Sequence, residues 1–141
     1  MEQVINRVLK ALELTADFYS FIPEAGLALA IPGAPSNKIG QQAWCIVGAR
    51  ESYLTALKNG SWNGFSCSLQ DCFDKRLILN KLEQTAIDLT EFVRSSSVKE
   101  LNINLLVDLL EHEVQHHGQL IRYAYANRLG FPNSWSERYT V

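Results

Sequence analysis

Two histidines, His112 and His116, stand four residues apart in the C-terminal third of the chain. On an α-helix this spacing places two side chains one turn apart on the same face, with Cβ atoms roughly 6 Å apart. Both imidazoles can then reach one ion, and neutral imidazole is a common ligand of zinc, nickel, copper and iron. We therefore predict a divalent metal site on His112 and His116. The alternative is two core histidines that each bond a backbone carbonyl.

The helix that carries this pair is predicted to run over residues 102–129. At about 100° per residue, one stripe of it is formed by Leu105, Leu109, His112, His116, Leu120 and Tyr123. Because the stripe is otherwise apolar, we expect the histidine pair to face the core. Glu113 and His117 flank the stripe and are the candidate catalytic residues. Glu113 is interpreted as a base, as a group that orients a ligand histidine, or as the partner of a basic side chain. His117 is interpreted as a support for the ligands or a solvent-facing residue.

Residues 112–116 also fit the HExxH pattern of zinc peptidases, in which two histidines bind zinc and the glutamate is the general base. Such an enzyme needs a third ligand and a scaffold for the substrate, usually a sheet edge. Glu137 is a candidate third ligand, but no segment of the chain alternates with the period of a strand. We therefore rank a zinc peptidase below the other functions.

A third ligand must come from another helix, and the second predicted helix offers Cys45. Its face is otherwise formed by Gln41, Ala49, Ser52 and Ala56, and these mostly small residues allow a close neighbour. Thiolate is a good zinc ligand. A cysteine in such a place is also often a small buried hydrophobe, so both interpretations remain open, with Gln41 the next candidate ligand.

Four segments show the hydrophobic periodicity of amphipathic helices: 2–19, 37–58, 68–94 and 102–129. Since no segment has strand periodicity, we predict an all-α fold: one four-helix bundle over residues 1–141. The long connection 23–36 contains the apolar stretch 27–31 and is expected to lie across the bundle or cover one end.

Polar residues at the predicted helix starts have the types that cap helices. Ser36 is the expected N-cap of the second helix, and Ser68–Asp71 is a capping box that would open the third. A second box, Ser134–Glu137, predicts a short helical turn at the end of the chain.

Composition excludes several classes of function. The 141 residues carry a net charge of −2 without a basic patch, so no nucleic-acid partner is expected. No apolar run approaches the roughly 20 residues of a membrane span. Cys45, Cys67 and Cys72 are an odd number without repeating spacing, which argues against a disulfide framework and for a reducing cytoplasm.

Three segments resemble the DinB-like (YfiT-like) metalloprotein superfamily. Residues 112–119, His-Glu-Val-Gln-His-His-Gly-Gln, resemble the HxxxHxGQ signature of its last long helix. Residues 131–139 resemble its proline, Ser-Trp and aromatic ending. Residues 45–54 resemble its second-helix motif, except that Cys45 stands where the family has a histidine.

The resemblance implies a bundle, often dimeric, with zinc or nickel on a histidine triad that leaves positions open for water. His112 and His116 match two members of the triad, and Cys45 replaces the third. The site then has either an altered metal preference or no metal. Characterised members include metal-dependent thiol transferases, which join a low-molecular-weight thiol to an electrophile, and a thiol-dependent isomerase. We expect a metal-dependent enzyme of a small-molecule substrate, either such a transferase or a hydrolase. The alternative is a non-catalytic stress-related or interaction protein with a degenerate site.

We also predict a homodimer. The resemblance implies it, and Trp62, Phe65 and Trp135 are aromatic side chains of the kind that marks interfaces. Sedimentation velocity at micromolar concentration is expected to show a species of twice the chain mass of 15.9 kDa. A single species at the monomer mass would contradict the prediction.

Overall fold

The computed structural model describes residues 1–97 and 100–141, and within these ranges it is all-helical, without a strand. Its elements are α1 (Glu2–Phe21), the 3-10 helix η1 (Glu24–Ala28), α2 (Ile39–Asn59), α3 (Lys75–Ser95), α4 (Ile103–Asn127) and α5 (Asn133–Tyr139). The prediction of an all-α chain is therefore confirmed. None of these helices is long and apolar enough to cross a membrane.

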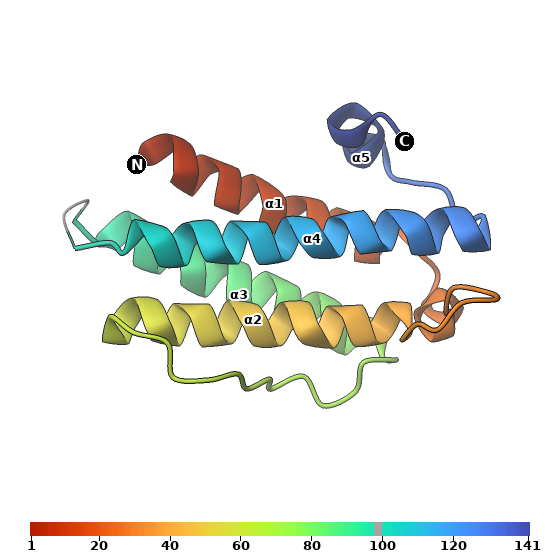
Figure 1. The fold of residues 1–141 in the computed structure, drawn as a ribbon, viewed down its shortest axis with the longest axis horizontal. Helices are drawn as coiled ribbons and strands as arrows, with labels where there is room; N and C mark the ends of the chain where they lie inside the picture. Colours follow the sequence, from red (N-terminus) through yellow and green to blue (C-terminus); the bar gives the residue numbers. More distant parts are fainter. Residues whose placement is uncertain (98–99) are drawn as a thin grey trace.

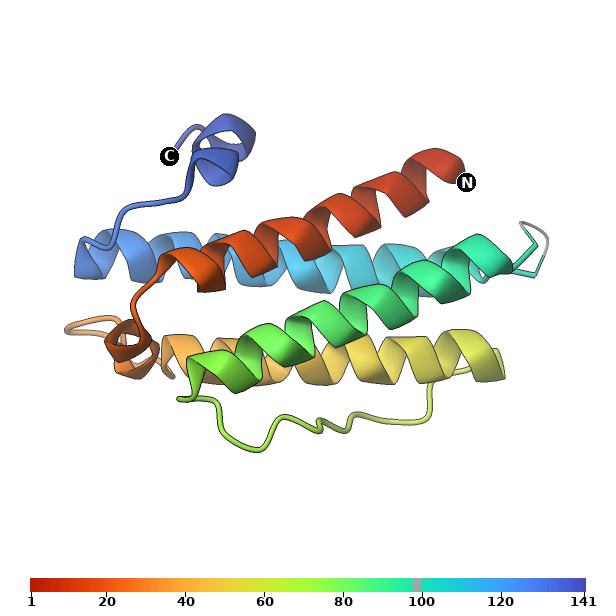
Figure 2. The same cartoon turned by 180° about the vertical axis from the view of Figure 1, so that it is seen from behind.

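The four long helices lie side by side along the long axis of the molecule (Figure 1). Helices α1 and α4 run in one direction and α2 and α3 in the other (Figure 2). Contacts join α1 to α3 and α4, and join α2 to the same two helices. Helix η1 packs against α2 at the end of the molecule where α1 turns towards α2 (Figure 1), which is one of the two positions expected for the apolar connection. Helix α5 packs on α1.

The core consists of two apolar clusters separated by a layer of buried polar side chains. One cluster, which includes Phe18 and Leu120, surrounds the C-terminal half of α1, and the other, which includes Val8 and Leu109, surrounds its N-terminal half. Between them the residues Thr15, Arg50, Thr85, Glu113 and His117 are almost or completely inaccessible to solvent. The polar layer thus lies in the middle of the helices that carry the predicted site.

The inward face of α4 is rotated from the predicted stripe. Leu109, His116, Leu120 and Tyr123 are buried as expected, but Glu113 and His117 lie at the centre of the buried face. His112 is only half-buried, at its edge. The periodicity counts glutamate as a surface residue, and this assumption fails when the carboxylate has a buried partner.

The predicted helix starts need correction. Helix α3 begins at Lys75 and not at residue 68, because Asp74 caps it by accepting from the Leu77 amide at 3.0 Å. Ser68 instead donates to the carboxylate of Glu51. Ser68, predicted as a cap from its residue type alone, is therefore used in another contact.

Two further caps were predicted wrongly, although the helices themselves exist. Ser36 accepts from the Ile31 amide at 2.8 Å, and α2 is preceded by Lys38 as its N-cap residue. The last helix has Pro132 as its N-cap residue in place of Ser134.

Residues 61–74, which we call the strap, run in extended conformation along the outer side of α2 (Figure 1). Two glycines of α2 permit the close approach. A Cβ on Gly40 would overlap the carbonyl oxygen of Cys72, and a Cβ on Gly48 would overlap the Phe65 ring and lie 2.8 Å from Cys67 Cβ. The small-residue face of α2 is therefore covered in part by the strap.

Helix α5 is held by Trp135, which is fully buried and donates from its indole nitrogen to the Leu14 carbonyl at 2.6 Å. Its expected exposure at a dimer interface is therefore wrong, because the side chain anchors the C-terminal segment to α1. Trp62 and Phe65 are 47% and 45% exposed and keep the exposure that the dimer prediction requires.

Replacing Gly48 by alanine is expected to lower the free energy of unfolding by about 1–3 kcal/mol, because the new methyl group overpacks the contact with the strap. The matched control is Gly118→Ala on α4, where no atom lies within 4 Å of an added Cβ. That change should stabilise the chain by about 0.5–1 kcal/mol, since alanine favours helix. Urea unfolding followed by circular dichroism measures both, and equal stabilisation by the two changes would refute the packing.

Candidate metal centre

His112 and His116 come from successive turns of α4, and their ring centroids are 4.6 Å apart with the rings inclined at 58°. His116 is 8% exposed and His112 is half-buried. The side chains are neighbours, as their spacing predicted, and they lie on the side of α4 that faces α2.

A chain of hydrogen bonds through Asn37 and Gln42 fixes the orientation of His116. Tyr123 donates to the backbone carbonyl of Asn37 at 2.7 Å, and Gln42 Nε2 donates to Asn37 Oδ1 at 2.8 Å. Gln42 Oε1 therefore faces His116 Nδ1, at 2.5 Å. An amide oxygen only accepts, so Nδ1 of His116 carries the proton and Nε2 keeps its lone pair. Metal-binding histidines are commonly oriented by such a partner.

His112 contributes a polar atom without a partner. Its Nδ1 is buried and makes no hydrogen bond, and a buried unsatisfied group of this kind costs about 1–3 kcal/mol. Burial lowers the pKa of His112. Burial, together with the neighbouring His112, lowers the pKa of His116 to about 4. Both rings are thus neutral near pH 7, the form that binds metal, and the donor set fits a transition metal.

Cys45 lies half-buried on α2, about 60° around the helix axis from Gln42. It lines a pocket of about 470 Å³ between α2 and the strap, together with Asn37, Gln41, Trp44, Leu69, Gln70 and Cys72. Burial raises the pKa of the Cys45 thiol.

Over residues 1–97 and 100–141, no three or more His, Cys, Asp or Glu side chains converge as a metal site. The structure therefore pairs the two histidines and does not bring Cys45 into a three-residue group with them. The residue of α2 that meets His116 is Gln42, and Gln41 lies in the pocket beside Cys45.

Glu113 lies in the polar layer and is fully buried. Its carboxylate accepts from the Arg50 guanidinium, with Nε at 3.2 Å, and from Thr15 Oγ1 at 2.5 Å. Burial alone would raise its pKa, but Arg50 and the hydrogen bonds hold the pKa of Glu113 below its ordinary value. Of the three roles considered for Glu113, the pairing with a basic side chain is the one observed. A carboxylate bound in this way is not free to act as the base of an HExxH peptidase.

His117 is also fully buried, so its predicted solvent-facing position is wrong. Its Nε2 lies 2.7 Å from Thr15 Oγ1 and its Nδ1 lies 2.6 Å from the Tyr139 hydroxyl. Since the Thr15 hydroxyl donates to Glu113, Nε2–H of His117 donates to Thr15 and Nδ1 accepts from Tyr139. Burial lowers the pKa of His117 to about 4, in agreement with this neutral form. His117 therefore holds α5 against the polar layer.

Arg50 is the structural residue that the sequence analysis missed. Besides Glu113, it donates to the backbone carbonyls of Leu82 at 3.1 Å and Leu12 at 3.2 Å. The available signal was its position three residues after Val47, on the apolar face of α2. A charged side chain on such a face requires a buried partner of opposite charge.

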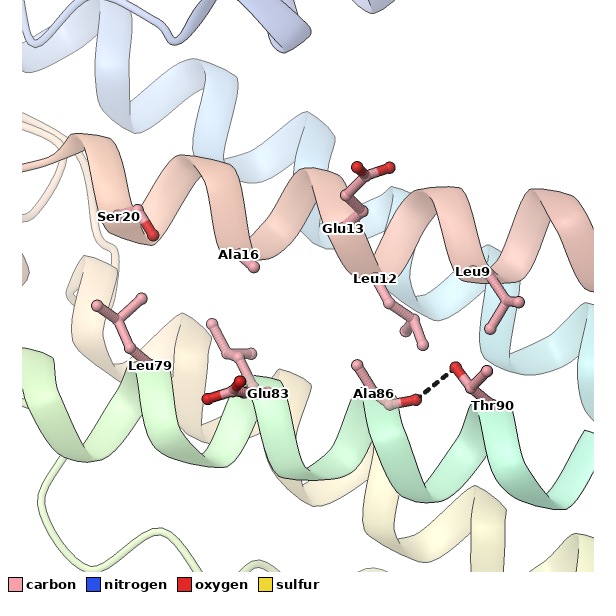
Figure 3. A pocket seen from close by; sticks show the side chains of 10 residues that line it. Leu9, Leu12, Glu13, Ala16, Ser20, Leu79, Glu83, Ala86 and Thr90 are labelled. Carbon is pink, nitrogen blue, oxygen red and sulfur yellow. Dashed lines mark hydrogen bonds between the residues drawn. The ribbon is translucent and has the colours of Figure 1, made fainter.

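The groove between α1 and α3 is separate from this centre. It encloses about 450 Å³ and is lined mainly by apolar side chains, with Glu13 and Glu83 at its rims (Figure 3). None of the predicted site residues contributes to it. The candidate centre is therefore confined to the α2–α4 side of the molecule.

Comparisons of the chain with protein-family models and with curated proteins find no match. The assignment of the centre accordingly rests on its own residues. Two neutral imidazoles are adjacent, one oriented by an amide and the other with an unpaired nitrogen.

The stability of the metal-free chain should fall as the pH is lowered from about 6.5 to about 4. In this window the unfolded chain protonates His117 and the folded chain does not. At about 1.4 kcal/mol per pKa unit, His117 accounts for on the order of 3 kcal/mol, and His116 acts in the same direction. Urea unfolding in chelator at several pH values measures the slope.

His117→Gln is the comparison for this measurement, because glutamine does not titrate in the window. It should flatten the dependence of the unfolding free energy on pH, leaving the parts contributed by His116, His112 and, near pH 4, Glu113. A variant with the full slope of the parent chain would show that His117 is not held in its neutral form.

Proposed function

We propose that the chain is a metal-dependent enzyme with a DinB-like four-helix bundle. Zinc or nickel is bound by His112 and His116, with Cys45 as the third protein ligand. The substrate is a small molecule, which the enzyme either joins to a low-molecular-weight thiol or hydrolyses. The observation that carries the proposal is the adjacent histidine pair in which Gln42 orients His116.

The surroundings of the pair support this chemistry. A bound divalent ion lowers the pKa of a coordinated thiol or water and supplies a nucleophile at neutral pH. Gln42 keeps the lone pair of His116 Nε2 free by holding the proton on the other nitrogen. The pocket beside Cys45 offers the Trp44 indole and the amide side chains of Gln41 and Gln70 to a small ligand. These groups can position a substrate by stacking and hydrogen bonding.

We further propose that this enzyme works as a cytoplasmic homodimer. The three cysteines are free thiols, which suits a reducing compartment. The exposed rings of Trp62 and Phe65 supply apolar surface of the kind that dimers bury.

A second candidate is a non-catalytic bundle with a degenerate site. It is favoured by the observation that the described part of the chain contains no converging group of three potential ligands. The two candidates differ in whether the Cys45 thiolate completes the site.

The first test is metal binding by protein purified without an affinity tag or chelator. We expect stoichiometric metal in the parent chain and at least about ten-fold weaker zinc binding, by isothermal titration calorimetry, in His112→Ala and His116→Ala. Gln42→Leu should weaken binding by about 10–100-fold, because the His116 ring loses its orienting partner. Gln119→Leu, at an exposed glutamine on α4, is the matched control. Full occupancy in both histidine variants would place the ligands elsewhere.

Variants of Cys45 separate the two candidates. If its thiolate is a ligand, Cys45→Ser should weaken zinc binding and bound metal should slow alkylation of Cys45 by iodoacetamide. If the site is degenerate, Cys45→His should create tight binding that the parent chain lacks. Unchanged occupancy in Cys45→Ala would refute the ligand assignment.

A further inference from the structure

Cys45 and Cys67 approach each other where the strap crosses α2. Cys67 Sγ lies 3.2 Å from the carbonyl oxygen of Trp44, the residue directly before Cys45. Standard bond lengths separate that oxygen from Cα of Cys45 by about 2.8 Å, so Cys67 Sγ lies within about 6 Å of this Cα.

The packing on Gly48 gives an independent bound. Cys67 Cβ lies 2.8 Å from the position that a Cβ on Gly48 would occupy, and residues 45 and 48 share one helix face at about 5–6 Å. The backbone carbonyl of Cys72 lies against Gly40, five residues or about 7.5 Å along the axis from Cys45. Cys67 is therefore the better placed partner of Cys45.

We propose that Cys45 and Cys67 are an oxidation-sensitive thiol pair that a peroxide converts into a disulfide between α2 and the strap. Disulfides require Cα atoms about 4.4–6.8 Å apart. The contacts above place Cys67 within one helix turn of Cys45, and the strap, which is not helical, has to move to close the remaining distance. Both residues are half-buried, so a small oxidant reaches them while larger thiols are hindered.

Two steps complete the reaction. The Cys67 sulfur attacks one oxygen of hydrogen peroxide, the O–O bond breaks, and the departing hydroxide takes the thiol proton to form water. Cys45 then attacks the sulfur of the resulting sulfenic acid, the S–O bond breaks, and hydroxide leaves with the Cys45 proton as a second water. The two thiols lose two electrons and two protons, and the peroxide is reduced to two waters.

The disulfide itself does not depend on the proposed metal function. Its consequence does: if Cys45 is the third ligand, its sulfur is no longer available as a thiolate after oxidation. Formation of the disulfide would then weaken metal binding in the parent chain. The disulfide is assayed in metal-free protein, so that its failure is separate from a failure of the metal site.

The test treats the reduced, metal-free full chain with hydrogen peroxide, blocks the remaining thiols and analyses tryptic peptides without reduction. Trypsin releases Cys45 on residues 39–50, and Cys67 with Cys72 on residues 59–75. The expected product is a cross-link between these peptides, two hydrogens lighter than their sum. Cys72→Ser makes the assignment unambiguous and should retain the cross-link.

Cys45→Ser and Cys67→Ser should each abolish the cross-link, with circular dichroism showing that the variants are folded. A cross-link that survives in Cys67→Ser and is lost in Cys72→Ser would overturn the proposal by naming Cys72 as the partner. Oxidation of the parent chain to sulfinic acids without a cross-link, or complete resistance to peroxide, would also overturn it.

Discussion

The buried ion pair between Arg50 and Glu113 is the constraint around which the helices are arranged. Moving each charge out of water costs several kcal/mol, and this cost is offset only when the partners are close and their remaining hydrogen-bonding groups are satisfied. The structure meets this condition with atoms from every long helix: the Leu12 carbonyl and the Thr15 hydroxyl of α1, and the Leu82 carbonyl of α3. A shift of one helix would leave a buried donor or acceptor unpaired, so the pair sets the register of all four.

The same constraint sets the rotation of α4. With Glu113 directed at Arg50, the residue one turn later, His117, is directed at Thr15 and Tyr139. His112 directly precedes Glu113 and His116 directly precedes His117. The two histidines therefore lie about 100° around the helix axis from Glu113 and His117, on the side that faces α2. The run of histidines and a glutamate is thereby divided into two pairs. Glu113 and His117 anchor the core and α5, and His112 and His116 face α2 and suit a metal.

The strap explains why α2 has small residues on its outer face. Glycine at positions 40 and 48 allows the extended segment to contact the helix backbone closely, and the Ser66 amide is bonded to the Ser52 hydroxyl at 3.0 Å. This arrangement places the pocket beside Cys45 and brings a second thiol to the same helix turn. The small-residue pattern indicated a close neighbour, but it does not distinguish a packed helix from an extended chain.

The sequence by itself determined the helical class, the approximate position of each long helix and the pairing of His112 with His116, because hydrophobic periodicity and i, i+4 spacing are local properties. It did not determine that Glu113 and His117 are buried, that Ser68 bonds the Glu51 carboxylate and caps no helix, or that Gln42 orients His116. Each of these depends on a partner far away in the chain: Arg50 for Glu113, Glu51 for Ser68 and α2 for His116. A polar side chain is classed as a surface residue until a partner compensates its desolvation, and only the tertiary structure supplies that partner.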